Sequence, residues 1–471
     1  MKSISKGDGA KTLSVTGFFA ITASMVITAY EYPTFATSGL TLITYLILGG
    51  LLWFIPVGLC SAEMATVEGW GEGGIFTWVS NNLGERWGFA AISFTYLQIA
   101  IGFIPMLYFI VGAVSDISGI SEINTNPLMK TAISLLILWS LALTQLGGLK
   151  NTQKIAKCGF FLGIVLPVLL LWFSAFWYFY HGGHRMIDLK LDGLMPHLSD
   201  KGGLEVFVAF ILSYMGIEAS ATHANEMYNS RKNYPLAILI LMICTILFSS
   251  VSGLIIALVM PNSEISLSSG LVQALSKITS HVTHDAVWAV KIFSALLVFG
   301  VMGEISAWIT GPSKGLLVTA KQGLLPVSFS GVNKNGVPVK LVMLQLLITS
   351  IAIVLFTNIS SSSNSAFLIA LSLTVLIYLC AYFMLFVSYI KMVITKKKTT
   401  SGFVIPGGKA CRLLVAAVGF ITSLFAFVVS FIPPESVIGH MQRKDYLFEL
   451  LISFLIVISI PFIVCKTRRK K

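Results

Sequence analysis

About twelve long apolar runs constrain this chain more than any other feature. Each holds roughly 20 mainly apolar residues, the length that an α-helix needs to cross the hydrocarbon core of a bilayer. The runs do not alternate between apolar and polar residues, which excludes a membrane β-barrel. We therefore predict an all-α membrane protein with about 12 transmembrane helices, at residues 13–36, 40–65, 87–114, 128–147, 155–180, 204–227, 235–260, 286–312, 339–357, 365–394, 411–432 and 446–465.

The composition excludes an ordinary soluble enzyme. Of 471 residues, 56% are hydrophobic and 11% are charged, whereas about 25% of a soluble domain is charged. The six cysteines contain no Cys-x-x-Cys pair, so we predict neither a disulfide framework nor a metal site. We also expect no cofactor.

The net charge of +12 reports orientation in the membrane. If the N-terminus is cytoplasmic, 24 of the 32 Lys and Arg residues fall on the cytoplasmic side. This excess follows the positive-inside rule and predicts that both termini are cytoplasmic. The basic excess therefore indicates contact with a lipid bilayer and no nucleic-acid partner.

Two connecting segments have a composition of their own. Residues 66–84 are rich in glycine and aromatic residues, which predicts a short interfacial helix or a re-entrant piece. Residues 395–409 are basic. We interpret them as a cytoplasmic loop that sets orientation and contacts anionic lipid.

Two acidic residues lie deep within apolar runs. Glu218 and Glu304 have no Lys or Arg within a helical turn, and in a bilayer such a carboxyl group favours its protonated form. A proton-coupled or pH-gated carrier uses this property, although a neutral Glu that packs between helices is the alternative. Glu31, Glu63 and Glu226 lie nearer the ends of their runs, where we interpret them as interfacial or capping carboxylates.

Small and polar residues interrupt two of the runs at matching positions. Such a pair is typical of transporters built from two inverted repeats, because interrupted helices free backbone groups that bind substrate. The predicted interruptions are Thr22, Ala23, Ser24 and Met25 in the first run, and Tyr214, Met215, Gly216 and Ile217 in the sixth.

Four tyrosines are candidates to close over a small substrate. Tyr378 and Tyr382 are four residues apart and share a helical face, while Tyr30 and Tyr96 lie in the first and third runs. An interfacial position is the alternative for all four, Tyr30 above all. His223 lies five residues after Glu218 and is more often a packed residue than a functional one.

Several motifs resemble the amino acid–polyamine–organocation superfamily. They are AEMATVEGWGEGGIFTWV (62–79), NEMYNSRKNYPLA (225–237) and FVIPGGK (403–409). Longer segments are most similar to the bacterial glutamate/γ-aminobutyrate antiporter subfamily, namely FFAITASMVITAYEYPTFATSG (18–39), GGLLWFIPVGLCSAEMATVEGW (49–70), YLQIAIGFIPMLYF (96–109), FVAFILSYMGIEASATHANEM (207–227) and VLIYLCAYFMLF (375–386).

The resemblance implies a LeuT-like fold with a 5+5 inverted repeat and discontinuous helices 1 and 6. It divides the chain into a cytoplasmic tail (1–12), a transporter core (13–394, with repeats at about 13–180 and 204–394), two appended helices (395–465) and a basic tail (466–471). The two interruptions become the substrate-binding backbone. The pathway or gating positions become Tyr30, Tyr96, Glu218, Glu304, Tyr378 and Tyr382.

By the same resemblance, the protein exchanges extracellular glutamate for intracellular γ-aminobutyrate across a bacterial inner membrane. It would work beside a cytoplasmic glutamate decarboxylase in acid resistance, and would not be an enzyme. Leu212 stands where related arginine antiporters have a tryptophan that stacks on guanidinium, which counts against arginine as substrate.

Two other functions remain open at this stage. One is a glutamate/glutamine or other neutral amino-acid exchanger of the same superfamily. The other is a membrane-embedded enzyme or sensor that uses His223, although the loops are too short to supply a soluble domain. The oligomeric state is not set by the sequence.

Overall fold

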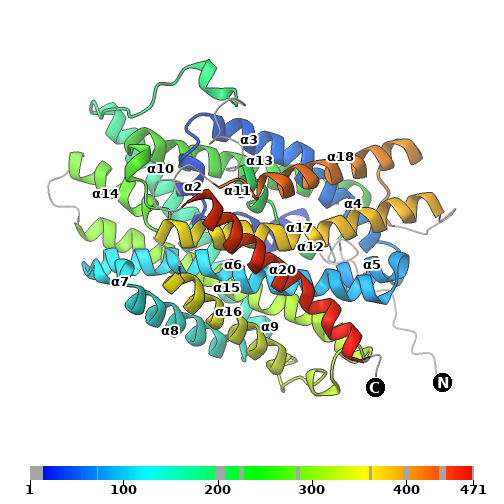
Figure 1. Ribbon diagram of the computed structural model, residues 1–471. Helices are drawn as coiled ribbons and strands as arrows, with labels where there is room; N and C mark the ends of the chain where they lie inside the picture. The colour runs from blue at the N-terminus through cyan, green and yellow to red at the C-terminus, as the bar shows by residue number, and fades with distance from the viewer. Residues whose placement is uncertain are drawn as a thin grey trace.

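The predicted all-helical architecture is confirmed. A computed structural model describes residues 14–71, 73–196, 207–221, 227–282, 287–359, 363–395, 402–433 and 442–468. Within these ranges the regular elements are all helices (Figure 1), and ten helical stretches are long and apolar enough to cross a membrane. The N-terminal tail (1–12), His223, Glu226 and residues 469–471 of the basic C-terminal tail lie outside the described residues.

The helices follow the predicted runs closely. Their bounds are α1 Val15–Val26, α2 Tyr32–Ala36, α3 Thr41–Gly49, η1 Gly50–Phe54, α4 Ile55–Ala65, α5 Ile75–Leu83, α6 Glu85–Ser118, α7 Glu122–Thr125, α8 Pro127–Gln145, α9 Leu149–Cys158, η2 Gly159–Val165, α10 Leu166–Tyr180, η3 Leu191–Leu194, α11 Phe207–Leu212, α12 Ile217–Ala221, α13 Ser230–Val259, η5 Asn262–Glu264, α14 Gly270–Val282, α15 Val287–Lys321, η6 Val327–Phe329, α16 Val339–Ile359, α17 Ser363–Thr395, α18 Gly408–Val429 and α20 Arg443–Arg468. The short helix α5 appears where the glycine-rich segment predicts one. Ten of the twelve predicted runs correspond to the ten candidate spans, and the first and sixth runs are each a pair of short helices.

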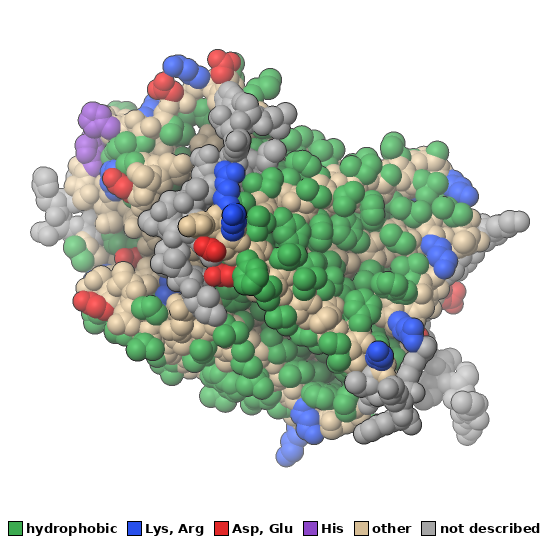
Figure 2. Space-filling view, in the orientation of Figure 1, with side chains coloured by type: hydrophobic (Ala, Val, Ile, Leu, Met, Phe, Trp, Pro, Cys, Tyr) green, Lys and Arg blue, Asp and Glu red, His purple; other side chains and the backbone are tan. Residues whose placement is uncertain are grey.

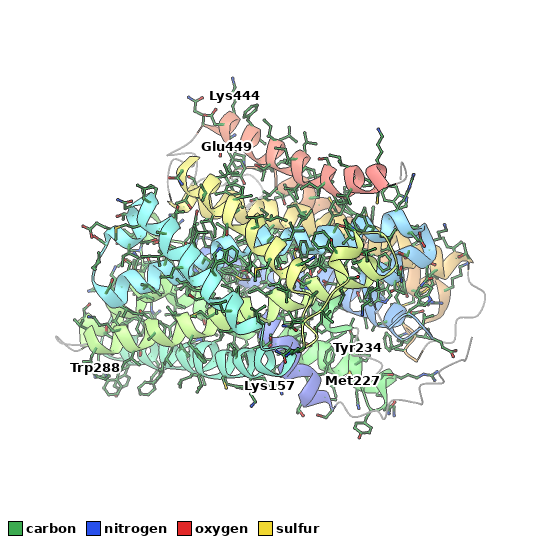
Figure 3. All side chains as sticks on the ribbon, turned by 90° about the horizontal axis from the view of Figure 1, so that it is seen from below. Lys157, Met227, Tyr234, Trp288, Lys444 and Glu449 are labelled. Atoms are coloured by element: carbon green, nitrogen blue, oxygen red, sulfur yellow. The ribbon has the colours of Figure 1, made fainter. Side chains whose placement is uncertain are left out.

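Two long helices form the centre of the molecule. In their most apolar windows, 94% of the residues of α6 and 89% of those of α17 are buried, against 17% for α20. Figure 1 shows α6 and α17 running through the middle while α20 crosses them obliquely. Figure 3 shows α20 on the outer edge, with Lys444 and Glu449 near its start. A helix that is apolar all round belongs in the interior, and α6 and α17 support the site described below.

The interruption in the sixth run lies where the sequence predicts it. Helix α11 ends at Leu212 and α12 begins at Ile217. Between them Gly216 adopts φ 108°, a conformation that residues with a Cβ atom rarely adopt. The Tyr214 hydroxyl of this interval donates to the carbonyl of Leu46 at 2.7 Å, so the interval is fixed to α3.

The interruption in the first run is displaced from the predicted one. Thr22, Ala23, Ser24 and Met25 are still helical, because α1 continues to Val26. The Thr22 hydroxyl donates to the Phe18 carbonyl at 2.9 Å, so its polarity is satisfied within the helix. The break falls instead between Val26 and Tyr32, where Pro33, which lacks an N–H group, suits the first turn of α2.

Glycines let α15 approach the π-helical segment η2 closely. A Cβ atom on Gly163 would lie 2.2 Å from the nitrogen and 2.3 Å from the Cα of Gly300. A Cβ atom on Gly159 would lie 3.0 Å from the Cα of Gly303. Small residues that allow backbones to touch are typical of membrane-helix interfaces.

A buried carboxylate joins three elements at one end of the molecule. Glu63 of α4, whose side chain is 2% exposed, pairs with Arg412 of α18. It also accepts from the Tyr389 hydroxyl of α17 at 2.7 Å and from the Ile405 amide at 3.0 Å. Glu63, two residues before the end of α4, therefore acts as a partner for groups inside the protein.

The segment before α18 is also more ordered than its basic composition suggests. Residues 396–401 lie outside the described residues, but Phe403 and Ile405 are each 2% exposed. The Phe403 amide donates to the Thr66 hydroxyl at 3.0 Å. The interpretation of 395–409 as a lipid-contacting loop does not hold for residues 403 and 405, which pack against α4.

Gly163→Ala is expected to destabilise the protein, because the added methyl group forces η2 and α15 apart, at a cost of about 1–3 kcal/mol for overpacking. The measurement is thermal unfolding of the detergent-solubilised protein followed by size-exclusion chromatography. Gly311→Ala, in the same helix α15, is the matched control, since a Cβ atom there meets nothing within 4 Å. Equal losses in the two variants would contradict the close approach.

Single substitutions Glu63→Gln and Arg412→Gln are each expected to lower stability, the second by about 3 kcal/mol because it leaves a buried carboxylate without its cation. The double variant is expected to lose less than the sum of the two, with a coupling energy of about 1–3 kcal/mol. A double-mutant cycle on thermal unfolding measures this coupling. Additive losses would show that the ion pair does not stabilise the junction of α4 and α18.

Candidate functional site

A small cavity lies between the two interrupted runs and the central helices. Its volume is about 30 Å³, which is enough to hold a water molecule. The lining comes from the first interruption, the end of α11, and helices α6, α15 and α17. The lining residues are Met25, Val26, Thr28, Tyr30, Glu31, Gln98, Ile99, Gly102, Met106, Leu212, Ser213, Met215, Glu304, Trp308, Thr374 and Tyr378.

Glu218 is held by the two tyrosines of α17. The Tyr378 hydroxyl donates to one carboxylate oxygen and the Tyr382 hydroxyl donates to the other, at 2.5 Å for Tyr382. The two rings lie 4.7 Å apart, as expected for residues that share a helical face. Both oxygens of Glu218 therefore have a hydroxyl partner, and both partners come from α17.

Gly216 links this cluster to the interrupted helix. Its amide donates to the Tyr382 hydroxyl at 3.3 Å, so Tyr382 accepts from the break and donates to the carboxylate. A Cβ atom on Gly216 would lie 2.8 Å from the ring of Trp308 in α15. The glycine thus serves the turn and also makes room for the indole.

Glu304 and Glu31 are held differently from Glu218. Their exposed fractions are 5% and 1%, respectively, and both line the cavity. Within the described residues, one carboxylate oxygen of each has no hydrogen-bond partner. The sequence gives Glu218 and Glu304 the same interpretation, whereas in the structure only Glu218 has a hydrogen-bond partner at both oxygens.

The predicted site residues divide into two groups. Those that line the cavity are Met25, Tyr30, Met215, Glu304 and Tyr378, and Glu218 and Tyr382 join them through hydrogen bonds. Those outside the lining are Thr22, Ala23, Ser24, Tyr96, Tyr214, Gly216 and Ile217. The Tyr96 hydroxyl donates instead to the carbonyl of Leu341 in α16, at 2.5 Å.

Sequence reasoning missed five polar or aromatic residues of the lining, namely Thr28, Gln98, Ser213, Trp308 and Thr374. Thr28 and Gln98 are ordinary polar residues within apolar runs, and Trp308 lies on a helix with several possible buried faces. Glu31 was assigned to the membrane interface and is almost fully buried. Trp308 also supplies an aromatic ring in this cavity, so the missing ring at position 212 by itself does not exclude a guanidinium.

Comparison with known proteins decides the family. A model of the amino acid permease family matches residues 13–460. The chain belongs to this family. As a permease it is a transporter and not an enzyme, and the ten long apolar helices among the described residues make it a multi-pass membrane protein.

Three relatives show how far the similarity extends. Glutamate/gamma-aminobutyrate antiporters of Lactococcus lactis subsp. lactis and subsp. cremoris are 45% and 46% identical to the permease over 461 residues, covering 98% of this chain and 92% of each relative. An uncharacterized transporter of Legionella pneumophila is 30% identical over 460 residues, with 97% of both chains covered. The resemblance read from the motifs is confirmed.

Glu218→Gln is expected to flatten the pH dependence of the transport rate, because an amide can neither take up nor release a proton. The measurement is the initial rate of transport into proteoliposomes at a series of pH values. Tyr378→Phe is the control, since it removes one hydrogen bond and leaves the carboxyl group in place. An unchanged profile in Glu218→Gln would assign this residue to packing.

Proposed function

We propose that this permease exchanges extracellular glutamate for intracellular γ-aminobutyrate. The observation that carries the proposal is the 45–46% identity, over 98% of the chain, to two proteins named glutamate/gamma-aminobutyrate antiporters. Similarity over the full length includes both interruptions and every helix that lines the cavity.

The chemistry of the cavity suits amino-acid substrates. Both substrates carry an ammonium group and at least one carboxylate, and the lining offers carboxylates, hydroxyl groups and an amide beside apolar side chains. Backbone groups freed at a helix break add donors and acceptors for such polar ends. A cavity of about 30 Å³ is too small for a whole glutamate, so binding requires the lining to open, as in alternating access.

The proposed architecture has 12 membrane crossings in a LeuT-like arrangement. The α1–α2 and α11–α12 pairs would be discontinuous helices 1 and 6 of two inverted repeats at about 13–180 and 204–394. Residues 395–465 would add two helices, and residues 1–12 and 466–471 would form the tails. In support, each break falls within the first apolar run of its half.

We place the protein in a bacterial inner membrane with both termini cytoplasmic. The distribution of 24 of 32 basic residues supports this orientation. Figure 2 shows that the charged side chains at the right-hand end are nearly all Lys and Arg, whereas both signs are present at the opposite end.

A cytoplasmic glutamate decarboxylase is the proposed functional partner. Decarboxylation of glutamate consumes a proton and yields γ-aminobutyrate, so the exchange would supply the substrate and remove the product of that reaction. The pair would remove protons from the cytoplasm and thereby support acid resistance.

Proteoliposomes loaded with γ-aminobutyrate are expected to take up labelled glutamate, while empty vesicles are not, because exchange requires a counter-substrate. The assay covers about pH 4.5 to 7, the range from carboxyl to histidine titration. Vesicles loaded with glutamine test the rival exchanger. Uptake with glutamine and none with γ-aminobutyrate would overturn the proposal in favour of that rival.

A further inference from the structure

Four buried polar atoms line the central cavity without a hydrogen bond of standard geometry in the described part of the chain. They are the Thr28 hydroxyl, one carboxylate oxygen each of Glu31 and Glu304, and the side-chain nitrogen of Gln98. The four side chains are 5% exposed or less. Buried polar groups in native proteins are nearly all paired, so an unpaired group aimed into a cavity indicates a missing ligand.

Three of these atoms are oxygens, and two of them belong to carboxyl groups that line the same cavity. Among the described residues, neither Glu31 nor Glu304 forms an ion pair with Lys, Arg or His. A carboxyl group in a membrane interior is costly to ionise without a cation. A cationic group in the cavity would stabilise the ionised carboxylates and supply the donors that their free oxygens lack.

Glu218 does not share this property, although it is close by. Both of its oxygens accept from tyrosine hydroxyls, so a cation there would compete with two existing donors. The cation site therefore falls on the side of the cavity formed by the first interruption and α15.

We propose that Glu31, Glu304 and Thr28 form a subsite for the ammonium group of the transported amino acid. An ammonium group has three N–H donors, which match the three unpaired oxygens. It is about as large as a water molecule, so it fits the cavity of about 30 Å³. This inference rests on the proposed amino-acid exchange and adds which residues hold the positive end of the substrate.

The remaining unpaired atom has the opposite character. The Gln98 side-chain nitrogen is a donor, and it lines the same cavity from α6. A substrate whose ammonium group lies between Glu31 and Glu304 would present its carboxylate to donors elsewhere, and Gln98 is one of these. The acceptors and the donor of the lining thus orient the substrate, with its ammonium group towards Glu31 and Glu304 and a carboxylate towards Gln98.

The test compares glutamate with glutarate, which lacks only the ammonium group, as inhibitors of labelled glutamate uptake into proteoliposomes. In Glu31→Gln and in Glu304→Gln, the half-inhibitory concentration of glutamate is expected to rise by about tenfold or more, the factor for each 1.4 kcal/mol. That of glutarate is expected to stay the same or fall, because glutarate has no positive charge to lose.

Two threonines provide a matched control. Thr28 and Thr34 are both buried with unpaired hydroxyls, but only Thr28 lines the cavity. Thr28→Val is expected to weaken glutamate and not glutarate, whereas Thr34→Val is expected to leave both unchanged. If a Glu variant fails to fold by size-exclusion chromatography, the threonine pair carries the test.

Two results would overturn the subsite. Equal weakening of glutamate and glutarate would show a general disturbance of the cavity. A shifted pH profile with an unchanged glutamate-to-glutarate ratio would assign the acids to a proton. Failure of the proposed function is distinct, since it appears in the wild type as absence of glutamate exchange. The comparison is then repeated with whichever amino acid the wild type exchanges and its deaminated analogue.

Discussion

The absence of water from a membrane interior is the constraint on which the rest of this structure depends. A helix satisfies its own backbone, but each interruption leaves amide and carbonyl groups that need partners inside the protein. At the second interruption, tyrosine hydroxyls form such hydrogen bonds. The Tyr214 hydroxyl donates to the Leu46 carbonyl, and the Tyr382 hydroxyl accepts from the Gly216 amide. The central position of α17, which carries Tyr382, follows from this requirement.

Buried acids show the same constraint applied in two ways. Glu63 and Glu218 each receive a donor at both oxygens, from Arg412, Tyr389 and Ile405 in one case and from two tyrosines in the other. Glu31 and Glu304 each keep an unpaired oxygen at the cavity. The first pair joins elements of the fold, while the second leaves binding capacity unused, which identifies it as the part of the interior that a ligand completes.

Local sequence predicts those features that local chemistry decides. The apolar runs predict the helices, and Gly216 predicts the second break because its positive φ depends on one residue. The predicted position of the first break is wrong because the Thr22 hydroxyl donates a hydrogen bond within its own helix. Counting polar residues in the sequence does not reveal this bond. The side-chain partners of Glu63 lie 326 and 349 positions away in the chain. Trp308 faces the cavity because of the orientation that α15 takes about its own axis. Such contacts follow from packing, so the sequence alone did not indicate them.

The lengths of the helices indicate which parts move when the cavity opens. Helix α2 has five residues, whereas α6 has 34. A five-residue helix has few internal hydrogen bonds, and its position depends on side-chain contacts more than on its own stability. Rearranging α2 therefore disrupts fewer bonds than bending a central helix. Glu31 directly precedes α2, so the short segment that is easiest to move carries one of the two acids with an unpaired oxygen at the cavity.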